Sequence, residues 1–204
     1  ELGERNVTAS DIALELDISS GNLYYHFKGK DAILAALFQD CYRELASILA
    51  TPILEPSFLE DEEPLERCWL FLTVLLEAMY QARFLYVNQG DLMQRYPDVD
   101  RGMRRLMSLK KQAASQLATV LLASVDIAAY PQRLKHVSNS MAMTLMYWLN
   151  YDQLSAGSAS QQQTIHRAVL QVLSHCAPYL GDTQANFYTE CELINARLLD
   201  DRGA

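Results

Sequence analysis

Features typical of fibrous, secreted and membrane-spanning proteins are scarce in this sequence. Among its 204 residues there are only eight glycines and six prolines, which excludes collagen-like and linker-like compositions. The unbroken apolar runs are short, such as Cys68–Leu72, whereas a membrane-spanning helix needs about 20 apolar residues. The segment Glu1–Asn6 is too polar for a secretory signal peptide. We therefore expect a cytoplasmic protein with no membrane partner.

Groupings of side chains that hold metals or cofactors are also absent. The four cysteines stand at positions 41, 68, 176 and 191, and no two of them form a C-x-x-C pair. The four histidines, at 26, 136, 166 and 175, are scattered, and the motifs H-E-x-x-H and E-x-x-H do not occur. The sequence therefore predicts no metal site and no cofactor. Free thiols in a reducing compartment are favoured over disulfides.

An excess of basic residues, the usual electrostatic mark of a nucleic-acid-binding protein, is missing as well. The chain has 25 acidic and 17 basic residues and a net charge of −8. Residues 1–50 alone hold four basic residues against eight acidic ones. This balance does not exclude a nucleic acid. It predicts weak non-specific affinity, so that binding must depend on a few placed contacts.

What the sequence does have is a high apolar content, 50%, arranged almost everywhere with helical period. We predict an all-α protein with a smaller domain at 1–50 and a larger helical bundle at 51–204. The basic run Arg95–Lys111 is interpreted as a solvated helix face, with an anion or DNA as the alternative partner. The expected elements are helices at 30–50, 65–83, 98–124, 131–154, 161–180 and 183–199, one or two short helices at 84–96, and an acidic loop at 55–66.

Two of these helices, 131–154 and 161–180, each carry a second apolar stripe besides the one that a monomer core needs. The simplest partner for two such stripes is the same pair of helices from a second subunit. A fully buried helix inside one subunit is the alternative. The predicted homodimer contacts are Ala142, Met146, Leu149, Leu170, Leu173 and Ala177.

The N-terminal part predicts two short helices joined by a tight turn. Thr8 and Asp11 have the T-x-x-D spacing of a capping box, which begins the first helix. Its expected buried face consists of Ile12, Ala13 and Leu16. This helix is therefore barely two turns long.

The second short helix follows a sharp turn. Asp17 can end the first helix because aspartate tolerates left-handed backbone, and Ser19 or Ser20 caps the second. Leu23 and Phe27, four residues apart, face inward and leave the polar and aromatic residues between them exposed. Two such helices, the second with exposed hydrogen-bonding and aromatic side chains, form a helix-turn-helix.

These exposed side chains suit DNA. Asn22 can pair with an adenine edge, hydroxyl groups can bind phosphate or base, and a tyrosine ring can contact a thymine methyl group. Lys28 and Lys30 flank the start of the following helix, where the macrodipole disfavours cations. Helix N-termini bind anions, so the two lysines suit a phosphate. Plain solvation of both lysines is the alternative.

The stretch from Ile12 to Leu34, with its Leu-Tyr-Tyr-His-Phe core followed by Lys-x-Lys, resembles the DNA-binding signature of the TetR family of bacterial transcriptional regulators. The resemblance covers about residues 5–45. It implies an all-α homodimer in which each subunit joins a three-helix DNA-binding domain to a larger regulatory domain. It also implies a repressor that binds double-stranded operator DNA and releases it when an effector changes the spacing of the two recognition helices.

The resemblance also implies which residues contact DNA. Asp17 stands where the family usually has a glycine, which should cost a little strain. The family's first helix is largely missing from this sequence, so we expect that helix and a basic leader upstream of Val7. The matching positions are Thr8, Ser10, Ser20, Gly21, Asn22, Tyr24, Tyr25, His26 and Lys30, to which the sequence argument adds Lys28.

Regulatory domains of this family often enclose a pocket among the central helices. The effector expected here is a small apolar or amphipathic molecule. The candidate residues that line this pocket are Trp69, Thr73, Met79, Tyr80, Tyr86, Met107 and Tyr147, although each of these residues singly also suits an ordinary core.

The alternative function is a helical dimeric adaptor that has lost DNA binding and acts through protein partners. An enzyme is disfavoured because no nucleophile–base pair or converging carboxylates are recognisable.

Overall fold

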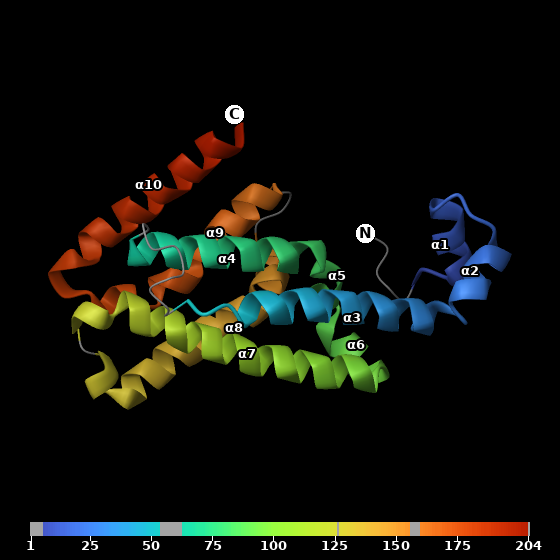
Figure 1. The fold of residues 1–204 in the computed structure, drawn as a ribbon, viewed down its shortest axis with the longest axis horizontal. Helices are drawn as coiled ribbons and strands as arrows, with labels where there is room; N and C mark the ends of the chain where they lie inside the picture. The colour runs from blue at the N-terminus through green and yellow to red at the C-terminus, as the bar shows by residue number, and fades with distance from the viewer. Residues whose placement is uncertain (1–5, 54–62, 126, 156–159, 204) are drawn as a thin grey trace.

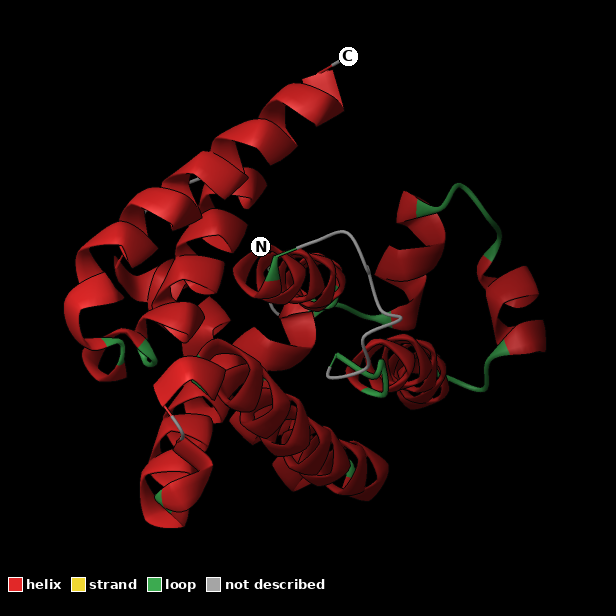
Figure 2. Ribbon diagram, turned by 60° about the vertical axis from the view of Figure 1, so that its left-hand side comes forward, coloured by secondary structure: helices red, strands yellow, loops and turns green. Residues whose placement is uncertain are grey.

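The protein is seen here in a computed structural model that describes residues 6–53, 63–125, 127–155 and 160–203. Over these residues it forms ten α-helices, a few 3₁₀ turns and no strand, which confirms the predicted all-α class (Figure 2). None of the described helices is both long and apolar enough to cross a membrane. The acidic loop expected at 55–66 falls mostly outside the described residues.

The two short helices near the N-terminus have the predicted caps. Helix α1 (Ala9–Glu15) begins at Thr8, whose hydroxyl accepts a hydrogen bond from the Asp11 amide at 3.2 Å, while the Asp11 carboxylate accepts one from the Thr8 amide at 2.8 Å. Asp17, with φ 53°, makes the left-handed turn. Helix α2 (Ser20–His26) is capped by Ser19, whose hydroxyl accepts from the Asn22 amide at 3.1 Å.

A small core holds this unit together. It consists of Ala9, Ala13, Leu23 and Ile33, with Ile12, Ile18 and Phe27 packed against it. The prediction that Leu16 belongs to the buried face of the first helix is wrong. Leu16 is the C-cap of α1, where the chain turns, and its side chain is 60% exposed.

Seven further helices complete the chain, and they form one continuous core with the rest of α3 (Lys30–Leu49). Helix α3 connects the small unit, at one end of the long axis in Figure 1, to this bundle. It packs on α4 and α7, while α8 packs on α7 and α9. The seven are α4 (Pro64–Gln81), α5 (Arg83–Val87), α6 (Gln89–Arg95), α7 (Pro97–Leu121), α8 (Pro131–Ser155), α9 (Gln161–Ser174) and α10 (Gln184–Gly203).

Helix positions agree with the sequence prediction better than helix ends do. Helices α4 and α7 both begin at a proline, a residue well suited to the first helical position. The helix predicted at 161–180 ends at Ser174, and a 3₁₀ turn over Ala177–Tyr179 follows it. The cause is Pro178, which cannot continue the α-helical hydrogen bonding.

Two contacts fix α3 on α7 and thereby position the small unit. The buried ring of Phe38 lies so close to Gly102 that a Cβ atom at this glycine would overlap it. Nearer the N-terminus of α3, the Tyr96 hydroxyl donates a 2.9 Å hydrogen bond to Asp31. Tyr96 stands directly before α7, so this bond joins the start of α7 to the first turn of α3.

The six predicted dimer contacts do not form an outward-facing patch. Ala142, Met146, Leu149, Leu173 and Ala177 are buried in the core of the single subunit, and Leu170 is half-buried against it. Their pattern is that of helices buried inside one subunit, because α8 packs on both α7 and α9. The apolar side chains that α8 exposes are instead Met143, Tyr147, Tyr151 and Leu154.

Candidate DNA-binding surface and effector pocket

Helix α2 presents the side chains that the sequence assigned to DNA. Asn22, Tyr24, Tyr25 and His26 are all exposed, and Tyr25 is the most exposed tyrosine among them at 83%. The ring of Tyr25 meets that of His26 edge-on, with centroids 5.1 Å apart. Leu23 alone is buried and anchors the helix, so the rest of α2 is available to a partner.

Among the predicted DNA contacts with small side chains, one caps a helix and the others are exposed. The Thr8 hydroxyl is engaged in capping α1, and its 2.7 Å hydrogen bond to Asp11 helps to lower the pKa of that carboxyl group. Ser10 and Ser20 are exposed, since Ser19 and not Ser20 serves as the cap of α2. A Cβ atom at Gly21 would meet only the Ser19 hydroxyl, at 4.0 Å, so no packing within the protein requires glycine there.

The two lysines lie where α2 leads into α3. Lys28 is exposed and Lys30 is half-buried at the first position of α3. Between them Gly29 serves as the N-cap with φ 108°, a left-handed backbone that favours glycine. The lysines therefore stand beside the N-terminal amide groups of a 20-residue helix, an arrangement suited to a phosphate.

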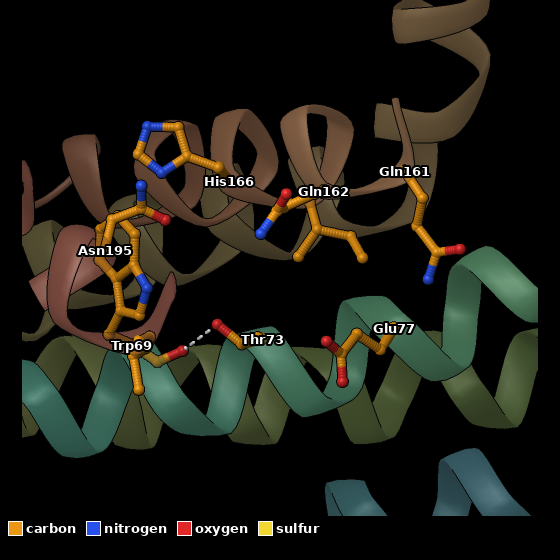
Figure 3. Close-up of a pocket in the computed structure, with 9 residues that line it drawn as sticks. Trp69, Thr73, Glu77, Gln161, Gln162, His166 and Asn195 are labelled. Carbon is orange, nitrogen blue, oxygen red and sulfur yellow. Dashed lines mark hydrogen bonds between the residues drawn. The ribbon is translucent and has the colours of Figure 1, made fainter. Parts of the chain in front are cut away.

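A pocket of about 190 Å³ lies in the bundle between α4, α9 and α10 (Figure 3). Helix α4 contributes Trp69, Thr73 and Glu77 to it; Gln162 and His166 come from α9 and Asn195 from α10. The Thr73 hydroxyl donates to the Trp69 carbonyl oxygen at 2.9 Å. Trp69 and Thr73 are thus the two predicted effector residues that line this pocket.

Helix α9, which forms one wall of the pocket, is joined to α8 by hydrogen bonds. The carboxylate of the buried Asp152 accepts hydrogen bonds from Thr164 at 2.8 Å and from Arg167 at 2.6 Å. The indole N–H of Trp148 donates to the Thr164 carbonyl oxygen at 3.2 Å. The wall is therefore held by polar contacts, as well as by its apolar face.

The other five predicted effector residues are not brought to this pocket. Met79 is fully buried in the core, and Met107 is packed against it. Tyr80 lies beneath the Arg83 guanidinium, and Tyr147 is 53% exposed on α8. Tyr86 is buried, and its hydroxyl accepts a hydrogen bond from Lys110.

Lys110 is a site feature that the sequence interpretation missed. It falls in the basic run 95–111, yet its side chain is fully buried, whereas the interpretation was a solvated helix face. Its ammonium nitrogen donates to the Tyr86 hydroxyl and the Leu145 carbonyl oxygen, both at 3.2 Å, and lies 4.4 Å from the centre of the Tyr86 ring. Burial lowers the pKa of Lys110 to about 7.

Comparison with known proteins agrees with this geometry. A model of the bacterial regulatory proteins of the tetR family matches residues 1–37, and a model of bacterial transcriptional repressors, TetR, matches residues 42–187. The chain belongs to the TetR family of bacterial transcriptional regulators. This TetR-family chain therefore regulates transcription through an N-terminal helix-turn-helix, and the family is one of regulators and not of enzymes.

A solved structure has the same fold. It is the crystal structure of a TetR-family transcriptional regulator from Marinobacter aquaeolei VT8, with a TM-score of 0.73 and 22% sequence identity. The match covers 94% of this chain and 90% of that one. No curated protein sequence matches the chain.

Within this TetR-family regulator, the sequence interpretation named two of the nine pocket residues, Trp69 and Thr73, and missed the other seven, among them Glu77, His166 and Asn195. Glu77 follows Trp69 and Thr73 at intervals of four residues, so the helical period alone places it on their face of α4. His166 and Asn195 carried no such signal, because their approach to α4 depends on the packing of α9 and α10.

Proposed function

We propose that this regulator is a homodimeric repressor that binds operator DNA through α2 and is released by a small-molecule effector. The observation that carries the proposal is the surface of α2, where one buried leucine holds the helix and the hydrogen-bonding and aromatic side chains are exposed. Asn22, Tyr24, Tyr25 and His26 would contact bases and phosphates in the major groove. Ser10, Ser20, Gly21, Lys28 and Lys30 would contact the backbone at its edges.

Release of the operator DNA would follow from the way in which α3 connects the DNA-binding unit to the helical bundle. Helix α3 carries the DNA-binding unit at one end and packs on α4 and α7 along the rest of its length. The Tyr96–Asp31 hydrogen bond and the Phe38–Gly102 contact tie its position to α7. An effector that binds better to a displaced arrangement of the bundle would shift the population away from the spacing that DNA requires.

The dimer contact that we infer is the exposed face of α8 and not the buried stripe that the sequence indicated. Met143, Tyr147, Tyr151 and Leu154 recur at intervals of three and four residues and are between 53% and 89% exposed. The segment 139–155 has only one charged residue, Asp152, which is itself buried and paired with Arg167. A face that is apolar and uncharged fits a second copy of itself across a two-fold axis.

The DNA-binding part of the proposal is tested with the full-length protein and DNA from the region upstream of its own gene. We expect a gel shift by a specific fragment, with a shallow dependence on salt, because residues 1–50 carry few positive charges. Failure to shift any fragment at low salt would contradict the proposal. In that case the acidic balance of residues 1–50 would favour the alternative, a helical adaptor acting through protein partners.

The dimer is tested separately by sedimentation of the protein and of Tyr151→Glu. A glutamate on the α8 face would place two like charges across the two-fold axis, so we expect a monomer that retains its helical circular dichroism. Gln153→Glu, at an exposed position on another face of α8, is the matched control and should leave the dimer intact. A wild-type monomer at micromolar concentration would contradict the dimer.

A further inference from the structure

A second hollow, of about 470 Å³, lies where the first turn of α4, the end of α7 and α10 meet. Small-molecule sites in proteins commonly have volumes of about 300–1,000 Å³, so the size of this hollow suits a ligand. An engineered apolar cavity of roughly 150 Å³ accommodates benzene. The hollow therefore has room for an apolar body of two six-membered rings, whereas the pocket beside Trp69, at about 190 Å³, has room for one.

The contacts that a ligand needs are open in this hollow and closed in the pocket beside Trp69. Trp69 is 1% exposed, and Glu77 already has an interaction partner. In the hollow, by contrast, Leu193 is 58% exposed, and Leu121 and Leu180 are half-buried. Of the two, the hollow is therefore the one that a ligand can enter without displacing a side chain.

Much of the lining of the hollow is apolar and comes from separate parts of the chain. Helices α4, α7 and α10 contribute to it, as does the 3₁₀ region between α9 and α10. An apolar body placed there would remove exposed apolar surface from water on both partners. The apolar lining consists of Leu65, Leu121, Leu180, Phe187, Leu193 and Ile194.

The charges that line the hollow leave it negative. Glu63, Glu66 and Glu190 line it together with one basic residue, Arg197. Arg197 is paired with Glu66 at 3.3 Å. Glu63 and Glu190 are exposed and have neither an ion pair nor a hydrogen bond among the described residues. A cation in the hollow would therefore meet two uncompensated carboxylates, whereas an anion would be repelled.

The spacing along α10 brings one of these carboxylates next to the apolar lining. Glu190 precedes Leu193 by three residues and Ile194 by four. Residues at these intervals on a helix have Cβ atoms about 5–6 Å apart. A ligand whose apolar body packs on Leu193 can thus place a cationic group, joined to that body by a short chain, beside the carboxylate of Glu190.

We propose that the hollow between α4, α7 and α10 binds an amphipathic amine, with an apolar body about the size of two rings against Leu121, Leu180 and Leu193 and its ammonium group beside Glu190. Occupancy bears on the DNA-binding unit because α4 and α7, whose ends line the hollow, both pack on α3. The proposal rests on the proposed function only in treating this amine as the effector.

Binding is tested by titration calorimetry of the full chain with three probes that share one apolar body. These are 3,3-diphenylpropylamine, the neutral 3,3-diphenylpropan-1-ol and the anionic 3,3-diphenylpropanoate. We expect the amine to bind about fivefold more tightly than the alcohol, the gain that one ion pair open to solvent supplies, and the anion to bind most weakly. Added salt should reduce the preference for the amine without weakening the alcohol. Equal binding of all three, preference for the anion, or no binding of any would overturn the proposal.

Variants locate the ligand in the hollow. Glu190→Gln should reduce the affinity for the amine to about that for the alcohol, whereas Glu44→Gln, at an exposed position on α3, should leave it unchanged. Leu193→Asn should weaken the amine and the alcohol alike, whereas Val74→Asn, at a 49% exposed position of α4 outside the hollow, should weaken neither. Because all four positions are exposed, thermal unfolding of each variant should stay close to that of the wild type. An unchanged preference in Glu190→Gln, or unchanged affinities in Leu193→Asn, would overturn the assignment.

A second copy of the chain is the other occupant that would cover an apolar hollow. In that case the wild type would bind none of the probes and Leu193→Asn would convert a sedimenting dimer into a monomer, and this pair of results would overturn the proposal. The calorimetry needs no DNA, so a chain that shifts its operator but binds none of the probes contradicts this inference alone. A chain that binds the amine but shifts no DNA contradicts only the proposed function.

Discussion

The DNA-binding unit and the regulatory bundle differ in how far their aromatic and polar side chains are exposed. Among the described residues, the unit formed by α1, α2 and the start of α3 has a core of only four buried residues, and its aromatic and hydrogen-bonding groups are exposed. The bundle buries both of its tryptophans, Tyr86 and even a lysine, and its pocket is lined from three helices. Substitutions should therefore alter binding in the first region and stability in the second.

The difference in core size also affects how easily each region opens. A unit with few buried apolar contacts opens locally at low free energy, whereas a continuous core opens only globally. The small unit depends for its placement on α3, which belongs to both cores through Ile33 and Phe38. A change within the bundle can thus reposition the unit without unfolding it, which is what a regulator requires.

The largest expected effect concerns the buried lysine of the bundle. An unfolded lysine has a pKa near 10.4, whereas burial lowers that of Lys110 to about 7, so between these values the unfolded chain binds a proton that the folded chain lacks. Lys110 therefore contributes a rise in stability with pH across this window, of up to about 1.4 kcal/mol per pH unit. Lys110→Met removes that contribution.

The measurement is urea unfolding of the wild type and Lys110→Met from pH 6 to pH 10. The stability of the variant relative to the wild type should be highest at pH 7 and below, and should fall as the pH rises. Lys111→Met, at the exposed neighbouring position, should show no pH-dependent difference. A constant difference for Lys110→Met would mean that this lysine keeps its ordinary pKa in the fold.

The next effect concerns the contact that joins α3 to α7. Gly102→Ala places a methyl group against the buried ring of Phe38, and such overpacking costs about 1–3 kcal/mol. We expect a lower midpoint in thermal unfolding. The control is Gly90→Ala in α6, where a Cβ atom would meet nothing within 4 Å and the change should be neutral or stabilising. If both variants unfold like the wild type, α3 and α7 are not packed as described.

A binding effect without a stability effect is expected in the small unit. Tyr25→Ala removes an 83% exposed ring from α2, so unfolding should change little, while operator affinity falls by about tenfold, or ~1.4 kcal/mol. Tyr130→Ala removes a 51% exposed ring far from α2 and should leave affinity unchanged. Fluorescence anisotropy with a labelled operator measures both variants. Loss of fold in Tyr25→Ala would assign this tyrosine a structural role.

The smallest expected effect has opposite signs for stability and binding. Gly21 lies inside α2, where alanine is more favourable by about 0.5–1 kcal/mol, and no neighbouring atom of the protein opposes the added methyl group. Gly21→Ala should therefore stabilise the unit slightly and weaken operator binding, because the methyl group lies where the DNA backbone would approach. Weaker binding together with lower stability would contradict this account of the glycine.

The two regions also differ in what their sequence could predict. In the small unit, Thr8, Asp17 and Leu23 act through local rules of capping, turn and helical period, and the structure has each as expected. Leu16 is the exception there, since its burial depended on where α1 ends. In the bundle the same rules located every long helix, because strong apolar periodicity is itself local.

What the sequence could not predict in the bundle is which face of each helix meets which neighbour. Met146 and Leu149 have the spacing of an interface but are buried in the core of the single subunit, while Tyr151 and Leu154 lie on the exposed face. Lys110 has the residue type of a surface position, yet the close packing of α7 and α8 buries it. These outcomes depend on tertiary packing, which period and residue type do not encode.

The central claim is that exposed α2 reads DNA from a two-fold symmetric dimer, and DNase I footprinting on the DNA upstream of the protein's own gene tests it most directly. We expect two protected half-sites of related sequence whose centres lie one helical turn of DNA, about 34–36 Å, or a whole multiple of it apart. Absence of any protected site at low salt, or protection that persists unchanged in Tyr25→Ala, would contradict it.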